Sequence, residues 1–267
     1  MEFNKIKNKG LKFSCTLAVL VSLMLSQIAF AARPTEHCFG VKHPNMSYSC
    51  LGGRVWTVSA LDTMSYVKDI HSSLDNNGYY NQYYFSNNNA TAVANSIGND
   101  AIFYINSHGG AGLVCCPYYD SGSSSWKMTL LTGTNTKSES IAVALQTKYG
   151  STTDKLKKVR FAYFGSCYSA KTASTTDGWG NLLDTVTGLG VDCALGFTGT
   201  ITVSKEGYFA KRLITYYGMD PNNTVSACAA SSKADTYNKY GDYGGVDKYV
   251  IKGSGSIKLV PAAYGTY

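Results

Sequence analysis

Two apolar runs constrain the fold of this chain more than any other feature of its sequence. The first, AIFYINSHGG, covers residues 101–110, and the second, VRFAYFGSCYSA, covers residues 159–170. Each run is apolar or aromatic until it stops abruptly at small and polar residues. A strand needs such a continuous run when both faces of a parallel sheet are covered. We therefore expect two buried parallel strands, one leading to His108 and the other to Cys167.

The rest of the chain alternates between strand-like and helix-like segments. Strands are expected at residues 54–60, 82–86, 192–203 and 257–260, and helices at 60–74, 89–97, 137–149, 179–187, 205–217 and 224–237. Residues 113–134 are expected to form a β-hairpin or an extended loop. This alternation predicts an α/β fold, a three-layer α/β/α sandwich with a mostly parallel central sheet.

The first 31 residues have the pattern of a secretory signal peptide. Four lysines precede an apolar stretch from about Phe13 to Phe30, and Ala29-Phe30-Ala31 fits a small-x-small cleavage site. An uncleaved membrane anchor is the alternative. We expect a secreted or extracytoplasmic protein with no stable membrane anchor after cleavage. We divide the chain into a signal peptide at 1–31, an irregular N-terminal segment at 32–53 and one α/β domain at 54–267.

Charge gives no reason to expect a nucleic-acid partner. The full chain has a formal net charge of +7, and cleavage after Ala31 removes four lysines and one glutamate, which leaves +4 (20 basic minus 16 acidic residues). The remaining charges are scattered. The densest basic run, at residues 155–158, is typical of a solvated helix end.

Seven cysteines remain after cleavage, an odd number for an extracytoplasmic chain: Cys38, Cys50, Cys115, Cys116, Cys167, Cys193 and Cys228. Thiols outside the cytoplasm tend to pair, and an unpaired one is a candidate reactive group. We expect a local disulfide between Cys38 and Cys50, and Cys167 as the unpaired thiol. His37, Cys38 and Cys50 lack the paired-ligand spacing of a zinc site, so no metal is expected.

His108 and Cys167 together suggest nucleophilic chemistry. Ligands of open α/β sheets bind outside the carboxyl ends of the strands, where both residues are expected. An imidazole there takes the thiol proton, and the thiolate attacks a carbonyl carbon. Gly109 would let its backbone N–H face the developing oxyanion, with the N–H of Cys167 as the second donor. The competing interpretation is a hydrogen-bonded histidine and a buried structural cysteine.

The order of residues along the chain narrows the possible architectures. All four histidines precede Cys167, whereas papain-like and α/β-hydrolase sites need a histidine after the nucleophile. Chymotrypsin-like cysteine peptidases do have histidine before cysteine, but they are all-β, and the helical spacings here argue against them.

With His108-Gly109 and Ser166-Cys167-Tyr168-Ser169 each following an apolar block, the chain resembles the caspase-like superfamily. This group, clan CD, contains caspases, metacaspases, legumains, gingipains, clostripain-like peptidases and separase-like or CHAT domains. The resemblance covers roughly residues 54–237. It implies a caspase-like fold, His108 as general base and acid, Cys167 as nucleophile, Gly109 and Cys167 as the oxyanion hole, and no cofactor.

The resemblance also implies where the substrate residue before the cleaved bond binds. Its pocket would involve Asp62, Gly165, Ser166 and Thr198. Asp62 is the only charged side chain among them, which suggests a preference for Arg or Lys. Alternatively, Asp62 caps the helix that begins at about Thr63.

Two functions follow from these expectations. One is a secreted cysteine endopeptidase that cleaves protein or peptide substrates through a His–Cys dyad and an acyl-enzyme. The other is a catalytically inactive caspase-like scaffold that acts as a secreted or surface binding protein, with the Tyr-rich segment 113–126 as its binding face. A reduced, accessible Cys167 within reach of His108 favours the first function. The sequence leaves the oligomeric state open.

Overall fold

The computed structural model describes residues 34–50, 53–85, 89–150 and 154–260 of the 267-residue chain. The predicted signal peptide at 1–31 lies outside these residues. Within them, no helix is both long and apolar enough to cross a membrane.

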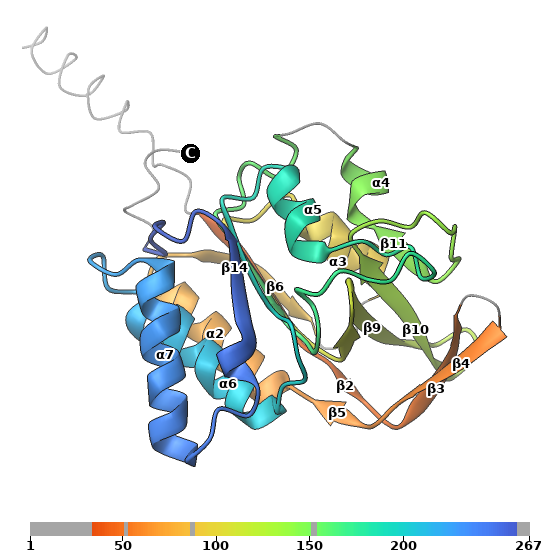
Figure 1. The fold of residues 1–267 in the computed structure, drawn as a ribbon, viewed down its shortest axis with the longest axis horizontal. Helices are drawn as coiled ribbons and strands as arrows, with labels where there is room; N and C mark the ends of the chain where they lie inside the picture. The colour runs from red at the N-terminus through yellow and green to blue at the C-terminus, as the bar shows by residue number, and fades with distance from the viewer. Residues whose placement is uncertain (1–33, 51–52, 86–88, 151–153, 261–267) are drawn as a thin grey trace, which may run out of the picture. The chain divides into compact units, whose positions relative to one another are not determined.

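A six-stranded sheet forms the middle layer of the fold (Figure 1). Its strands, in spatial order, are β14 (Tyr249–Gly253), β13 (Cys193–Phe197), β12 (Phe161–Gly165), β7 (Ile102–Asn106), β1 (Thr35–Phe39) and β6 (Tyr80–Phe85). Neighbouring strands are parallel except at one edge, where β14 runs antiparallel to β13. The two apolar runs of the sequence are therefore the adjacent central strands β7 and β12.

Helices cover both faces of this sheet (Figure 1). One face carries α2 (Met64–Asn76), α6 (Val203–Lys211) with its continuing π-helix η2 (Arg212–Tyr217), and α7 (Val225–Tyr240). The other carries α3 (Ala90–Ile97), α4 (Leu145–Tyr149) and α5 (Leu182–Gly188). Successive side chains of a strand pack into opposite layers, as Phe103 and Tyr104 of β7 do. The predicted three-layer α/β/α sandwich with a mostly parallel sheet is confirmed.

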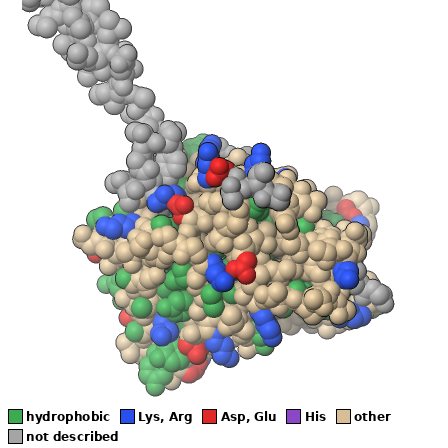
Figure 2. All heavy atoms as spheres, turned by 45° about the horizontal axis from the view of Figure 1, so that its top comes forward, with side chains coloured by type: hydrophobic (Ala, Val, Ile, Leu, Met, Phe, Trp, Pro, Cys, Tyr) green, Lys and Arg blue, Asp and Glu red, His purple; other side chains and the backbone are tan. Residues whose placement is uncertain are grey.

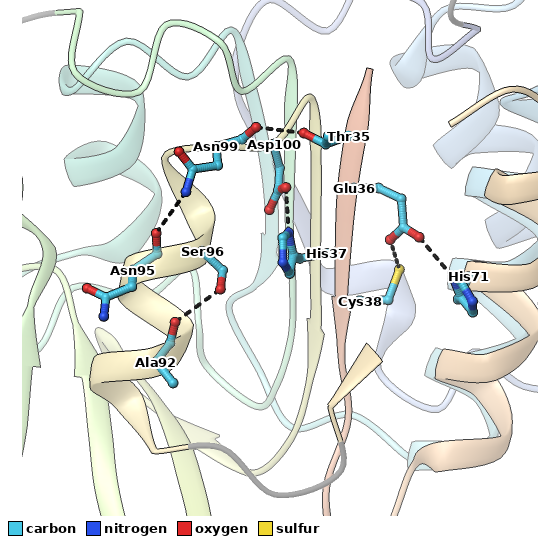
Figure 3. Close-up of polar contacts among 10 residues, drawn as sticks. All are labelled: Thr35, Glu36, His37, Cys38, His71, Ala92, Asn95, Ser96, Asn99 and Asp100. Atoms are coloured by element: carbon cyan, nitrogen blue, oxygen red, sulfur yellow. Dashed lines mark hydrogen bonds and ion pairs between the residues drawn. The ribbon is translucent and has the colours of Figure 1, made fainter. Parts of the chain in front are cut away.

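The described residues 34–50 consist mostly of β-strands, contrary to the irregular structure that the sequence predicted for 32–53. It contains β1, which lies between β6 and β7, and then β2 (Lys42–His43) and β3 (Met46–Cys50). The sequence pattern hid β1 because Glu36 and His37 interrupt its apolar run. Both side chains are buried and partnered: His71 Nδ1 lies 2.9 Å from Glu36 Oε1, and Asp100 Oδ1 lies 2.5 Å from His37 Nδ1 (Figure 3).

The strand expected at 54–60 lies outside the central sheet. β4 (Arg54–Val58) pairs with β3 in a separate hairpin, and the short β5 (Leu61–Asp62) pairs with β2. The chain thus leaves the end of β1 through β2, forms this hairpin, and returns through β5 to α2. The antiparallel pair of β2 and β5 is called the β2–β5 ribbon below.

Pairing between strands explains where the other predicted elements agree with the structure and where they differ from it. The hairpin expected at 113–134 is confirmed as β9 (Leu113–Asp120) and β10 (Ser125–Thr132), in a four-stranded sheet ordered β11-β10-β9-β8 with β8 (Gly109–Gly110). The helix expected at 137–149 is wrong over most of its length. Ala142–Ala144 pairs with β10 as β11, which leaves only the short α4. The last strand among the described residues is β14, after the 3₁₀-helix η3 (Val246–Lys248), and residues 257–260 do not form a strand.

The expected disulfide between Cys38 and Cys50 is absent, and all seven described cysteines are unpaired. Cys38 lies in β1 and donates its thiol hydrogen to Glu36 Oε2 at 2.9 Å (Figure 3). Cys50 packs in a separate cluster with Tyr48 and Trp179. His37 stacks on Phe39, on the opposite face of the sheet from Cys38, so the alternative zinc set is not assembled either. In the described part of the chain, no group of three or more His, Cys, Asp or Glu side chains is arranged to hold a metal.

Charged side chains are dispersed on the face drawn in Figure 2. Lys and Arg side chains lie singly or beside Asp and Glu, and this face has no continuous basic patch.

Candidate functional site

The register of β7 and β12 brings the two candidate catalytic residues to one edge of the sheet. Asn106 pairs with Gly165, and Ser107 N–H donates to the Gly165 carbonyl at 3.2 Å. His108 and Cys167 each follow a member of that pair by two residues. Adjacent strands are about 4.8 Å apart, so the two residues emerge side by side at the carboxyl edge.

At this edge the connections between strands also change direction along the sheet. From β1 the chain goes first to β6 on one side, and β7 then lies on the other side of β1. Connections therefore diverge between β1 and β7, which is where open α/β sheets bind ligands.

His108 is half-buried and held by a backbone carbonyl. Its Nε2 lies 2.9 Å from Ser59 O. Because a carbonyl only accepts hydrogen bonds, Nε2 carries the proton and Nδ1 keeps a lone pair. Burial lowers the pKa of His108 below its usual value, the Ser59 carbonyl opposes that shift, and nearby His43 adds to it. The lowered pKa favours the neutral imidazole, which is the form that a general base needs.

Cys167 is the only one of the seven described cysteines that is not buried. Its Sγ accepts a hydrogen bond from Ile201 N–H at 3.4 Å and lies 3.8 Å from Ile201 O, in the loop after β13. The next residue, Tyr168, has φ of +58°, a left-handed conformation that costs free energy in a non-glycine residue. Tyr168 N–H donates to Gly199 O at 3.0 Å, which helps hold this turn.

Gly109 lies against the residue that precedes Cys167. A Cβ placed on Gly109 would come within 2.5 Å of Ser166 Oγ, so only glycine fits. Cys115 N–H donates to His108 O at 2.8 Å, which makes those two residues a hydrogen-bonded pair between the strands. Such pairs alternate along antiparallel strands, so the N–H of Gly109 points away from β9. The direction of this N–H suits an oxyanion donor.

The residues expected to bind substrate do not form one pocket wall. Gly165 and Ser166 are buried, whereas Asp62 and Thr198 are exposed. Thr198 lies after β13, on the Cys167 side, and its N–H donates to Lys248 O at 3.0 Å. Asp62 lies on the β2–β5 ribbon, after β1, and so on the His108 side. Its Oδ1 accepts the Met64 N–H of α2 at 3.0 Å, and its Oδ2 pairs with Lys42 Nζ at 3.1 Å. Asp62 thus binds the first N–H of α2, although the N-cap position itself is Thr63.

A buried glutamate beneath the site was not anticipated from the sequence. Glu206 of α6 accepts the Tyr163 hydroxyl at 2.7 Å and also accepts a hydrogen bond from Asn106 Nδ2. A Cβ on Gly165 would come within 2.4 Å of Glu206 Oε1. Burial raises the pKa of Glu206 to about 8, opposed by the bonds from Tyr163 and Asn106. Through these two hydrogen bonds, Glu206 links β7, which leads to His108, with β12, which leads to Cys167.

His43 and Trp126 are two further residues that the sequence did not single out. The ring centroid of His43 lies 5.5 Å from that of His108 and 6.4 Å from that of Trp126. They line a surface groove of about 540 Å³ together with Lys42, Pro44, Ala60, Leu61 and Asp62. Only tertiary structure joins these segments, because β2, β5 and β10 are far apart in the sequence.

No protein-family model matches this chain, and no curated protein is significantly similar to it. A structure of the Arg-specific cysteine proteinase gingipain R is similar, with 9% identity and a TM-score of 0.46 over 85% of this chain and 47% of that one. The complex of Porphyromonas gingivalis RgpB pro- and mature domains gives 11% identity and a TM-score of 0.47 over 85% of this chain and 48% of that one. The Saccharomyces cerevisiae separase–securin complex gives 15% and 0.48 over 83% of this chain and 12% of that one.

This chain thus spans about half the length of the gingipain chains and about an eighth of the separase chain.

Proposed function

We propose that this chain is a secreted caspase-like cysteine peptidase in which His108 and Cys167 cleave peptide bonds. The observation that carries the proposal is the pairing of Asn106 with Gly165, because it brings an imidazole and a half-exposed thiol to one sheet edge. A neutral imidazole and an unpaired thiol are the two groups that covalent acyl transfer needs.

The reaction would follow from these positions. The thiol turns from Ile201 by rotation about χ1, and its proton passes to His108 Nδ1. The thiolate attacks the substrate carbonyl carbon, and the resulting oxyanion accepts hydrogen bonds from the N–H groups of Gly109 and Cys167. The C–N bond then breaks, and His108 returns the proton to the leaving amine. Water hydrolyses the remaining thioester.

The residues that the sequence predicted to bind substrate have different roles in this proposal. Thr198 and Asp62 are exposed on opposite sides of the dyad and are accessible to a bound peptide. Gly165 and Ser166 are buried and shape the turn that carries Cys167. Because Lys42 already neutralises Asp62, we do not expect Asp62 alone to require a basic substrate residue.

Labelling with a thiol-directed peptidyl probe, followed by mass spectrometry, tests the proposal. We expect selective labelling of Cys167 in folded protein and its loss in His108→Ala. The other six described cysteines are buried and serve as internal controls. Absence of Cys167 labelling in reduced, folded protein would instead support the inactive scaffold, for which the Tyr-rich segment 113–126 is the candidate binding face.

A further inference from the structure

The groove between His43 and Trp126 begins beside His108 rather than beside Cys167. His43, in its wall, lies in ring contact with His108, with centroids 5.5 Å apart. Ser59, whose carbonyl holds His108 Nε2, immediately precedes Ala60 in the opposite wall. The groove is lined mainly by the segments that follow β1, whereas Cys167 follows β12 on the other side of β7.

The chemistry of acyl transfer determines which part of a substrate lies on that side. The thiolate bonds to the carbonyl carbon, so the acyl half of the substrate stays on Cys167. The protonated imidazole must reach the nitrogen of the leaving amine when the C–N bond breaks. The residue that carries this nitrogen therefore lies next to His108, at the mouth of the groove.

The lining of the groove determines the kind of side chain that fits. Pro44, Ala60, Leu61 and the indole of Trp126 make most of it apolar. Tyr119 packs edge-on against Trp126, with ring centroids 5.8 Å apart. The two charged groups in the lining, Lys42 and Asp62, pair with each other at 3.1 Å. Its volume of about 540 Å³ is in the range of small-ligand sites.

We propose that the His43–Trp126 groove binds an aromatic or large aliphatic side chain of the residue that follows the cleaved peptide bond. This assignment rests on the proposed acyl-transfer function. It makes Trp126 a specificity-determining residue for the leaving group, because an aromatic side chain gains both apolar burial and ring contact there.

The partition of the acyl-enzyme between water and added amines tests this assignment directly. One acyl donor is fixed, and the amides of Phe, Leu, Gly, Asp and Lys compete as nucleophiles. An amine that attacks the thioester occupies the position of the leaving group by microscopic reversibility. We expect Phe and Leu amides to be at least about ten-fold more efficient than Gly amide, the discrimination typical of an apolar pocket.

Variants make the test specific to the groove. Trp126→Ala should remove most of the Phe-over-Gly preference, and Trp126→Phe should retain part of it. Tyr216→Ala, which truncates an exposed aromatic on η2, is the matched control and should leave the preference unchanged. If Trp126→Ala does not fold, the wild-type partition and Trp126→Phe still decide the question.

The outcomes separate the two proposals. Equal partition among the amides, or a preference for Asp or Lys amide, with Cys167 still acylated, would overturn the groove assignment and leave the peptidase intact. Failure to form any acyl-enzyme, with no probe labelling of Cys167 in folded protein, would overturn both.

Discussion

The four histidines of this chain lie two at each end of the central sheet, and the two ends treat them differently. Toward the amino end of the sheet, His37 of β1 and His71 of α2 contact the buried carboxyl groups of Asp100 and Glu36 respectively (Figure 3). At the carboxyl edge, His43 and His108 contact backbone carbonyls, of Pro44 and Ser59 respectively, and lie beside an open groove.

This difference separates structural from chemical histidines. A buried carboxyl group that needs a partner makes its histidine part of the packing, because loss of the histidine leaves that group unsatisfied. A carbonyl fixes the ring and its tautomer but leaves the second nitrogen available. The comparison predicts that substitution of His108 lowers activity but not stability. Substitution of His37, in contrast, should lower stability but not the chemistry at Cys167.

The largest effect is expected at the carboxyl edge. Cys167→Ala should lower kcat/KM by at least about 10,000-fold, as loss of a nucleophile does, and His108→Ala by about 100- to 10,000-fold. Activity on a peptide substrate chosen by screening measures both. Melting temperatures close to that of the wild type would show that only chemistry is lost. Full activity of either variant would contradict the comparison.

The next effect belongs to the amino end. His37→Ala leaves Asp100 buried without its imidazole partner, and we expect a loss of about 3–5 kcal/mol in the free energy of unfolding. Denaturant titration measures this loss. Probe labelling of Cys167 in the protein that remains folded should be unchanged. A variant as stable as the wild type would show that His37 is not structural.

A pH-dependent effect on stability is common to both ends. Burial raises the pKa values of Glu206, beneath the site, and Glu36, at the far end, to about 8 from 4.5. The folded state holds these protons more tightly, so this stability is fully present below pH 4.5 and is lost as pH rises through 8. Glu206→Gln cannot ionise and should flatten the decline in unfolding free energy. Glu36→Gln should do the same, and a variant that keeps the full decline would contradict the assignment of that carboxyl.

The smallest effect concerns the pH dependence of Cys167 labelling. The fall in labelling on the acidic side of this profile is called the acid limb. His43 is one of the causes that lower the pKa of His108, after burial. In His43→Gln that contribution is removed, so the pH at which Cys167 labelling falls off in acid should move upward, by little because burial persists. His71→Gln, at the other end of the sheet, is the control and should leave the limb in place. A shift of the acid limb to lower pH in His43→Gln would contradict this prediction.

The sequence predicted those parts of the fold that depend on local patterning. Phe103, Tyr104, Tyr163 and Phe164 lie in uninterrupted apolar runs, so β7 and β12 were evident, and the residues that follow them located His108 and Cys167. β1 was missed because Glu36 and His37 interrupt its apolar pattern and have their partners on α2 and just after α3. No local pattern encodes a partner that lies so far along the chain.

The rest of the site was hidden for the same reason. Glu206, His43 and Trp126 belong to segments with no shared motif. The return of the β2–β5 ribbon and the β9–β10 hairpin to the sheet edge assembles His43 and Trp126, and the packing of α6 against β7 and β12 places Glu206. Asp62 was identified, but its pairing with Lys42 depends on the register of that ribbon.

The buried polar residues of β1 also matter before the chain has folded. β1 is synthesised before both of its neighbours, β6 and β7, so its backbone hydrogen-bonding groups stay unpaired on both sides until those strands appear. An unpaired apolar strand invites association between chains. In the unfolded chain Glu36 has its ordinary pKa and is charged at neutral pH. A charge within an unpaired strand opposes such association, so Glu36 has a physical consequence in the unfolded chain as well as in the folded one.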